Sequence, residues 1–412
     1  MLRRSVAALL SAAAALTGAP LASSAPAREE AIARLLERRA AAVREGDRDA
    51  FLATISAVAS DAFVARQETF FDRLTALPVG RYRLTARWDL LGDLARERDR
   101  RRYTRATDVA IPLTQERMTF EGFDASPAVE DLYLTFVLHD GRWGVASDTD
   151  LEDIGFLSAR RIWEFGPVEA GGDERFLLLH HPGAPPRPEV LDLAHQGLAR
   201  VAAHWGGGWS RRVPVVVPAS ADELRRMLQI TVDPSDFVAF AYSNIDDRDH
   251  GFTGTRILLN RDAVASRSSA SAAGVIAHEL AHAATRSRSG PLVPLWVEEG
   301  MAEEVRHGGS RAALAFLAAR RATFDRKLPL DVEFQVGETD DLLLAYQEAY
   351  SAVRFFIERY GLERFRRFYA RLGGKRLVFG TQRYHVDRAL RATTGTSLSA
   401  FERDWAGSID AL

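Results

Sequence analysis

His278-Glu279-Leu280-Ala281-His282 lies inside the stretch from Ala272 to Thr285, which is rich in alanine and contains no proline. This composition favours a helix, on which residues four positions apart lie on one face, one turn apart. Both imidazoles can therefore reach a single metal ion. Glu279 lies one step around the helix, where its carboxylate can contact a water on that ion, which is the arrangement of a zinc hydrolase.

The alternative interpretation of the motif is a solvated helix face that carries two unrelated histidines, because so short a motif also arises by chance. The residues around it are apolar: Val275, Ile276, Ala277, Leu280, Ala281 and Ala283. An unpaired polar cluster would be costly to bury in such surroundings. The composition therefore favours the metal-binding interpretation.

A second helix is predicted after a short break. Gly290-Pro291 ends the first helix, because proline lacks an N–H donor and restricts the residue before it. Pro294 suits the first turn of the next helix, which contains Trp296-Val297-Glu298-Glu299-Gly300-Met301-Ala302. A catalytic zinc site has three protein ligands and one open position, and a glutamate on this helix is the candidate third ligand.

These two segments together resemble the gluzincin peptidases, and most of all the peptidase MA-like domains of bacterial secreted and membrane proteins. In that family His-Glu-x-x-His is followed by a short loop and then by Trp-x-x-Glu-Gly-x-Ala, which begins here at Trp296. The resemblance assigns one zinc ion per chain to His278, His282 and Glu299. It implies an exported metallopeptidase that hydrolyses peptide bonds through a zinc-activated water, with Glu279 as the general base.

The same resemblance suggests further site residues. Tyr346 is placed like the family tyrosine that donates to the developing oxyanion, and Tyr350, one turn later, is its neighbour; a tyrosine packed between helices is the other interpretation. Glu303 is placed like the acid behind the first histidine ligand, or it belongs to a solvated acidic face. The strand Gly254–Asn260 resembles the exposed sheet edge that pairs with substrate, although an ordinary core strand fits it equally well.

The resemblance also predicts the architecture of residues 165–412: a thermolysin-like domain with a small mixed sheet, an active-site helix and a C-terminal helical subdomain. The strands expected before the active-site helix are Val213–Val217, Phe237–Tyr242 and Arg256–Leu259. The Gly-x-Met-x-Asn-type segment of the aminopeptidases is not visible in the sequence. An endopeptidase is therefore the favoured type.

Residues 28–155 are predicted to form a separate α+β domain. Helical spacing of apolar residues from Ile32 to Val43 is followed by a second helical stretch, Asp61–Leu77. The expected strands are Tyr82–Leu91, Arg101–Leu113 and Leu132–His139, and a hairpin turn is expected at Asp140-Gly141. Helices followed by a curved antiparallel sheet are similar to the NTF2-like, SnoaL-type fold, which implies a cone for a small ligand or a packing surface. The whole chain is thus expected to be α+β.

Residues 1–27 have the pattern of a signal peptide. A basic start, Met1-Leu2-Arg3-Arg4, precedes the apolar run Val6–Leu16, and Ala25-Pro26-Ala27 is an Ala-x-Ala cleavage site. We expect export to a secreted or extracytoplasmic location, with an uncleaved anchor as the alternative. No other segment of the sequence is apolar and long enough to span a membrane.

Composition limits the ligands and partners. The chain contains no cysteine, so histidine and carboxylate are the strong zinc ligands it offers. The 54 basic and 56 acidic residues give a net charge of −2, which argues against nucleic acid as a partner. A peptide or protein substrate is what the resemblance to the gluzincin peptidases implies. The alternative function is a catalytically silent peptidase-fold module in which the N-terminal domain binds a ligand. The intact motif, Glu279 included, favours the enzyme.

Overall fold

The computed structural model describes residues 25–235, 237–245, 252–320, 326–334, 339–374 and 380–410. Helices and small sheets are mixed along the chain, which is compatible with the predicted α+β class. Most of the predicted signal peptide lies outside the described residues. Within the described residues, no helix combines the length and the apolar character that crossing a bilayer requires.

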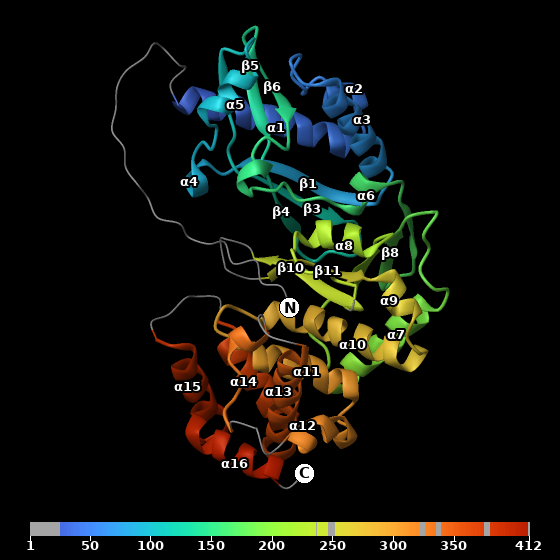
Figure 1. Cartoon of the computed structure of the whole chain (residues 1–412), viewed down its shortest axis with the longest axis vertical. Helices are drawn as coiled ribbons and strands as arrows, with labels where there is room; N and C mark the ends of the chain where they lie inside the picture. Colours follow the sequence, from blue (N-terminus) through green and yellow to red (C-terminus); the bar gives the residue numbers. More distant parts are fainter. Residues whose placement is uncertain are drawn as a thin grey trace.

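The N-terminal unit, Ala25–Phe165, lies at the top of Figure 1. Its helices are α1 (Ala25–Glu45), α2 (Arg48–Leu52), α3 (Asp61–Thr75), α4 (Trp88–Leu91), α5 (Glu97–Arg102), η1 (Glu152–Ile154) and α6 (Ile162–Phe165). One antiparallel sheet has the order β1 (Val79–Ala86), β3 (Thr114–Phe120), β4 (Ala128–Leu132). The other has the order β2 (Asp108–Ala110), β5 (Thr135–His139), β6 (Arg142–Ser147).

Two strands predicted for this unit are wrong in part. The segment Tyr82–Leu91 is a strand only as far as Ala86, where β1 ends and the chain turns into α4, whose leucines are exposed. The segment Arg101–Leu113 contains the end of helix α5 and the three residues of β2. Asp99 explains the helix, because its carboxylate accepts a hydrogen bond from the backbone N–H of Arg96 at 2.9 Å and so satisfies the first turn.

The other predictions for this unit agree better with the structure. The helical stretch Ile32–Val43 is confirmed within α1, and Asp61–Leu77 is confirmed as far as Thr75, where α3 ends. The segment Leu132–His139 holds the end of β4 and all of β5, which belong to different sheets. The hairpin turn is confirmed, because Asp140 and Gly141 join β5 to β6 with φ of 47° and 71°. Turns with positive φ at both central positions match the twist of the flanking strands.

A five-stranded mixed sheet crosses the middle of the molecule (Figure 1). Its order is β10 (Ala239–Ile245), β11 (Phe252–Leu259), β9 (Val213–Val217), β8 (Phe176–His180), β7 (Glu169–Gly172). The central strands β11, β9 and β8 are parallel, and β10 and β7 pair antiparallel with them at the edges. The small mixed sheet and its predicted strands are thus present, with β10 beginning two residues later than expected.

Both faces of this sheet are covered, which explains why β9 is almost continuously apolar. Val213, Val215 and Val217 point into the core shared with the helices below, whereas Val216 points into the core of the N-terminal unit. The apolar core of the N-terminal unit therefore continues onto the sheet. The division into domains 28–155 and 165–412 stays a prediction.

The predicted substrate-binding edge is in the wrong strand. Gly254–Asn260 belongs mostly to β11, which lies between β10 and β9 and is an interior strand. The chain before β11 folds back as the antiparallel strand β10 and covers that edge. Among the described strands, β10 pairs only with β11, so β10 is the edge strand on this side of the sheet.

Helices form the layer below the sheet (Figure 1). They are α7 (Val190–His204), α9 (Arg261–Ala265), α10 (Ser269–Thr285), η2 (Arg286–Arg288), α11 (Leu295–His307), η3 (Arg311–Leu314), α12 (Ala315–Arg320), η4 (Asp331–Phe334), α13 (Thr339–Tyr360), α14 (Leu362–Leu372), α15 (Gln382–Thr394) and α16 (Leu398–Asp410). Helix α8 (Ala221–Leu228) lies on the other face, toward the N-terminal unit. Helix α10 packs between α7 and α11, and α11 packs on α13.

The N-terminal unit meets the sheet along β4, which lies against β10 and β11. Gly254 makes this contact close: it has φ +59°, and a Cβ atom there would lie 2.1 Å from Cα of Ala128. Beside it, the Arg256 guanidinium forms a paired hydrogen bond with the Asp124 carboxylate, in which one Nη2–Oδ2 distance is 2.7 Å. The two strands nearest the sheet edge are therefore fixed to the N-terminal unit.

Gly254→Ala is expected to lower the free energy of unfolding, because the new methyl group meets the backbone of β4 and the residue keeps a left-handed conformation. Gly46→Ala is the matched control, since Gly46 has φ +70° and no atom within 4 Å of its added Cβ. The control should lose about 1–2 kcal/mol from conformation alone, and Gly254→Ala should lose clearly more. Chemical denaturation measures the free energy of unfolding of both variants. Equal decreases in the two variants would contradict the close contact at Gly254.

Candidate metal centre

Helix α10 carries the first motif in a buried position. Ser268 caps its start, because the Ser268 side chain accepts a hydrogen bond from the Ser271 N–H at 3.3 Å. Alanines on several faces allow the helix to lie between its neighbours, and His278, Glu279 and His282 are all buried. The interpretation of this motif as a solvated helix face is therefore wrong.

Helix α11 carries the second motif and begins directly after Pro294. Gly300 allows α13 to approach it, because a Cβ atom at this position would lie 2.3 Å from the carbonyl oxygen of Ala349. The glycine after Glu299 thus brings α13 against the helices that carry the two motifs. This packing places Tyr346 near the first motif.

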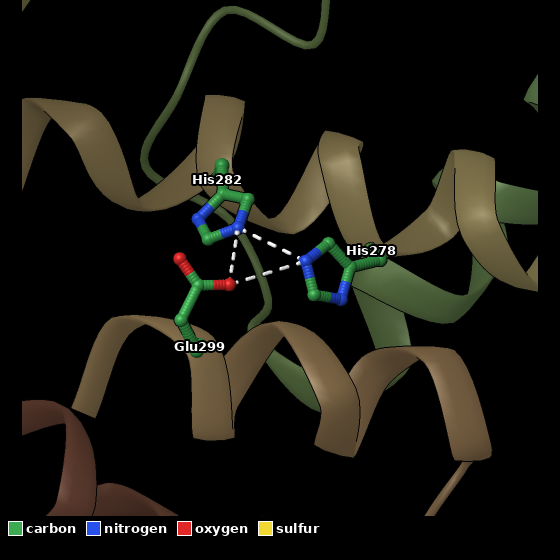
Figure 2. Close-up of side chains that lie close together, drawn as sticks. All are labelled: His278, His282 and Glu299. Atoms are coloured by element: carbon green, nitrogen blue, oxygen red, sulfur yellow. Dashed lines mark hydrogen bonds and ion pairs between the residues drawn. The ribbon is translucent and has the colours of Figure 1, made fainter. Parts of the chain in front are cut away.

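His278 and His282 point from α10 toward Glu299 on α11 (Figure 2). The two Nε2 atoms are 3.2 Å apart, and they lie 3.3 Å and 3.2 Å from Oε2 of Glu299. Ligands at roughly 2.0–2.1 Å from a tetrahedral zinc ion are about 3.3–3.4 Å apart. The spacing of the three atoms therefore fits a zinc ion between them, and these are the residues that could hold a metal.

The electrostatics of the triad also fit a cation. Glu299 is only 1% exposed, and within the described part of the chain neither of its oxygens has a conventional hydrogen-bond partner. A carboxylate removed from water is unfavourable unless positive charge compensates it. Burial raises the pKa of the Glu299 carboxyl, but the imidazoles of His282 and His278 outweigh this and hold that pKa well below its ordinary value.

The raised pKa of the His278 imidazole also shows that this site favours positive charge. Burial lowers its pKa, whereas the Glu299 and Glu303 carboxylates raise it, and the net result is a pKa of about 10. The pocket therefore stabilises a proton on this ring at neutral pH. A divalent cation held by the triad would take the place of that proton and supply the positive charge.

Glu303 lies behind the first histidine. Its Oε1 atom is 2.8 Å from Nδ1 of His278, and its Oε2 atom is 2.9 Å from Nε2 of His307. A carboxylate in this position fixes the orientation of a histidine ligand and makes it a stronger donor. The structure thus places Glu303 where the resemblance put it.

The acidic face proposed as the alternative for Glu303 is wrong. Glu298 and Glu304 are buried like Glu303. The Glu298 carboxylate accepts a hydrogen bond from the Ser289 hydroxyl, and the Glu304 carboxylate lies 3.1 Å from the Arg354 guanidinium. Each acid of α11 is therefore part of a buried polar network, because partners from distant segments reach it.

Glu279, the glutamate of the first motif, faces the cavity that the triad borders. The cavity is lined by Leu228, Phe237, Ala239, Phe240, Ala241, Tyr242, His278, Glu279, His282, Glu299 and Tyr346. The Oε2 atom of Glu279 accepts a hydrogen bond from the backbone N–H of Ala241 at 2.6 Å. A backbone donor on the sheet edge therefore holds the candidate base.

Of the two candidate tyrosines, the structure brings Tyr346 to this cavity. Its ring centroid lies 6.2 Å from that of His278. Burial, followed by the Glu299 and Glu279 carboxylates, raises the pKa of the Tyr346 phenol well above its ordinary value, so the hydroxyl keeps its proton. Tyr350 is fully buried, and its hydroxyl donates to the backbone carbonyl of Ser310 at 2.9 Å.

The contribution of β10 to the site was not predicted. Phe237–Tyr242 was expected only as a strand, although Ala239 and Ala241 alternate there with Phe240 and Tyr242. Small residues at every second position permit a close approach to a neighbouring helix. That alternation is the feature of the sequence from which the contact with α10 could have been predicted.

No protein-family model matches the chain, and no curated protein matches it in sequence. The resemblance to the gluzincin peptidases therefore rests on the residues of the two motifs. The fold and the geometry of the triad are compatible with this resemblance but do not by themselves identify the family.

His282→Ala is expected to abolish zinc binding, because the variant leaves two ligands where a stable site needs three. Elemental analysis after dialysis should find one zinc per wild-type chain and none in the variant, and added zinc should raise the unfolding temperature of the wild type only. His195→Ala is the control, since the imidazole of His195, on α7, pairs with Asp173 of the turn between β7 and β8 and not with the triad. Unchanged zinc content in His282→Ala would contradict the assignment.

Proposed function

We propose that the chain is an exported zinc-dependent peptidase of the gluzincin type that acts on peptide or protein substrates. One observation carries this proposal: His278, His282 and Glu299 converge within ligand distance at a cavity that Glu279 also faces. The signal-peptide pattern of residues 1–27 supports export. The charge balance supports a substrate other than nucleic acid.

In the proposed hydrolysis, the metal ion and Glu279 have separate roles. A zinc ion held by the triad would supply a Lewis acid that lowers the pKa of a water molecule and polarises the substrate carbonyl. Glu279 would accept a proton from the water as its oxygen attacks the carbonyl carbon. As the C–N bond breaks, Glu279 would pass that proton to the leaving nitrogen, which yields a carboxylic acid and an amine; the acid then gives up its remaining proton.

Two further groups would assist this reaction. The Tyr346 hydroxyl lines the same cavity and would donate to the carbonyl oxygen as negative charge develops on it. The Ala241 N–H would keep the Glu279 carboxylate at the side of the cavity next to the sheet edge. The chain thus offers a base, an oxyanion donor and a positioning donor around one metal site.

The free edge of β10 would bind the substrate backbone. The Asn260 N–H donates to the carbonyl of Val238 at 2.8 Å, so Val238, Phe240 and Tyr242 direct their backbone groups toward β11. Ala239 and Ala241 then direct theirs to the free edge, beside the triad. The Ala241 N–H donates to Glu279 there, so the Ala239 backbone and the Ala241 carbonyl would be the groups offered to a substrate. An extended peptide could add there as a further strand, which gives affinity with little dependence on sequence.

The finer fold assignments belong to the same proposal. The mixed sheet, the active-site helix α10 and the helices that follow support a gluzincin-type domain over residues 165–412. Helices α1 and α3 on antiparallel strands support an NTF2-like domain over residues 28–155, although its strands form two small sheets.

Glu279→Gln is expected to keep the fold and the zinc but to lose hydrolysis. Glutamine matches the shape of glutamate and cannot accept the proton, so turnover of a casein-type substrate should fall by roughly 10²–10⁴-fold. Elemental analysis of the same preparation is the control for metal loss. Turnover near the wild-type value would show that another base acts or that the reaction occurs elsewhere.

Tyr346→Phe is expected to lower kcat and to leave KM nearly unchanged, because the phenol interacts most strongly with the charge that develops in the transition state. Tyr350→Phe is the matched control: it should cost roughly 0.5–1.5 kcal/mol of stability through its lost hydrogen bond and leave kcat unchanged. Steady-state kinetics on one peptide separates the two. A loss of kcat in Tyr350→Phe alone would reverse the assignment.

A further inference from the structure

The edge strand β10 contacts the N-terminal unit as well as the candidate site. The Tyr242 hydroxyl donates to Oε2 of Glu130 on β4 at 2.9 Å, across 112 positions of sequence. Tyr242 also lines the cavity that holds the triad, and its ring packs on the core of the N-terminal unit. One side chain thus touches both parts of the molecule.

The residue before Tyr242 holds the candidate base. The Ala241 N–H donates to Oε2 of Glu279 at 2.6 Å. Because this acceptor is a carboxylate, the hydrogen bond belongs to the stronger, charge-assisted kind. A shift of β10 would move the donor, and with it the carboxylate that must meet the water.

Further contacts fix the same two strands to the N-terminal unit. Arg256 on β11 pairs with Asp124, and both side chains are buried. The Thr253 hydroxyl donates to the backbone carbonyl of Pro127, and Gly254 lets Ala128 approach the backbone of β11. Strand β10 has no second strand beside it among the described residues, so these contacts and Tyr242 supply much of its support.

We propose that the N-terminal unit positions the general base: Glu130, through Tyr242, fixes strand β10, and Ala241 of that strand fixes the Glu279 carboxylate. The inference rests on the proposed hydrolytic function. It makes Tyr242 and Glu130 positioning residues and gives the N-terminal unit a part in catalysis. Misplacement of a reacting group by about 1 Å can lower a rate by roughly 100-fold, so a small displacement of β10 is sufficient.

The first test removes the hydrogen bond and measures kinetics. Tyr242→Phe and Glu130→Ala should each lower kcat, measured at saturating peptide, by up to roughly 100-fold, and KM should rise as well, because the displaced strand β10 is also the proposed substrate-binding edge. Glu130→Gln keeps an oxygen acceptor and should retain most of the turnover. Tyr103→Phe is the matched control, since the Tyr103 hydroxyl donates to the buried Asp150 carboxylate in the same unit at 2.6 Å, away from β10; its kcat should stay at the wild-type value.

The second test asks whether Tyr242 acts through Glu279. In the Glu279→Gln background, Tyr242→Phe should cause little further loss of residual turnover, because residues that act as one unit are not additive. A loss of the same factor in both backgrounds would mean a general structural effect and would overturn the proposal. Wild-type kcat in the Tyr242→Phe single variant would overturn it as well.

The third test does not depend on hydrolysis. Amide hydrogen exchange should be faster across 239–245 in Tyr242→Phe and Glu130→Ala than in the wild type, and unchanged in Tyr103→Phe. Unchanged exchange in the first two variants would overturn the proposal. If the zinc-loaded wild type hydrolyses no peptide, the proposed function fails, and the exchange rates still decide whether Glu130 and Tyr242 fix β10.

Discussion

The buried carboxylate of Glu299 is the constraint on which the rest of the site depends. A carboxylate with almost no exposure and no conventional hydrogen-bond donor is tolerable only beside positive charge. The two imidazoles of α10 supply that positive charge. They reach Glu299 only if α10 and α11 are in contact at one register. Gly300 then admits α13 against α11. The Glu299 charge thus constrains the register of α10 against α11, within a core that apolar side chains of all three helices build.

The sequence predicts the part of the site that local periodicity determines. Residues four positions apart on a helix share a face whatever the tertiary structure, so the pairing of His278 and His282 could be predicted from spacing alone. The break at Gly290-Pro291 gave the second helix, and the family resemblance selected Glu299 rather than Glu298. In the structure Oε2 of Glu299 lies 3.3 Å and 3.2 Å from the two imidazoles, whereas the Glu298 carboxylate accepts a hydrogen bond from Ser289.

The parts that depend on distant partners could not be predicted in this way. Whether β11 is an edge strand depends on where the preceding segment, β10, packs. The residues of β11 alone do not determine that. The acids of α11 looked solvated because their partners, such as Arg354, come from other helices. The short strands of the N-terminal unit were misassigned because the Asp99 carboxylate stabilises a helical turn where the arginine-rich segment suggested a strand.

The sheet also explains why the two parts of the molecule cannot be treated as independent. Its central strands place apolar side chains on both faces, and Leu177, Leu179, Val216 and Leu258 belong to the core of the N-terminal unit. The sheet and its lower helices without that unit would expose this face to water, at about 25 cal/mol for each Å² of apolar surface. The hydrophobic effect thus keeps the N-terminal unit on the sheet whose edge strand holds Glu279. The packing that stabilises the fold and the contacts that orient the base act on the same strands, so selection for stability would also maintain the geometry of the site.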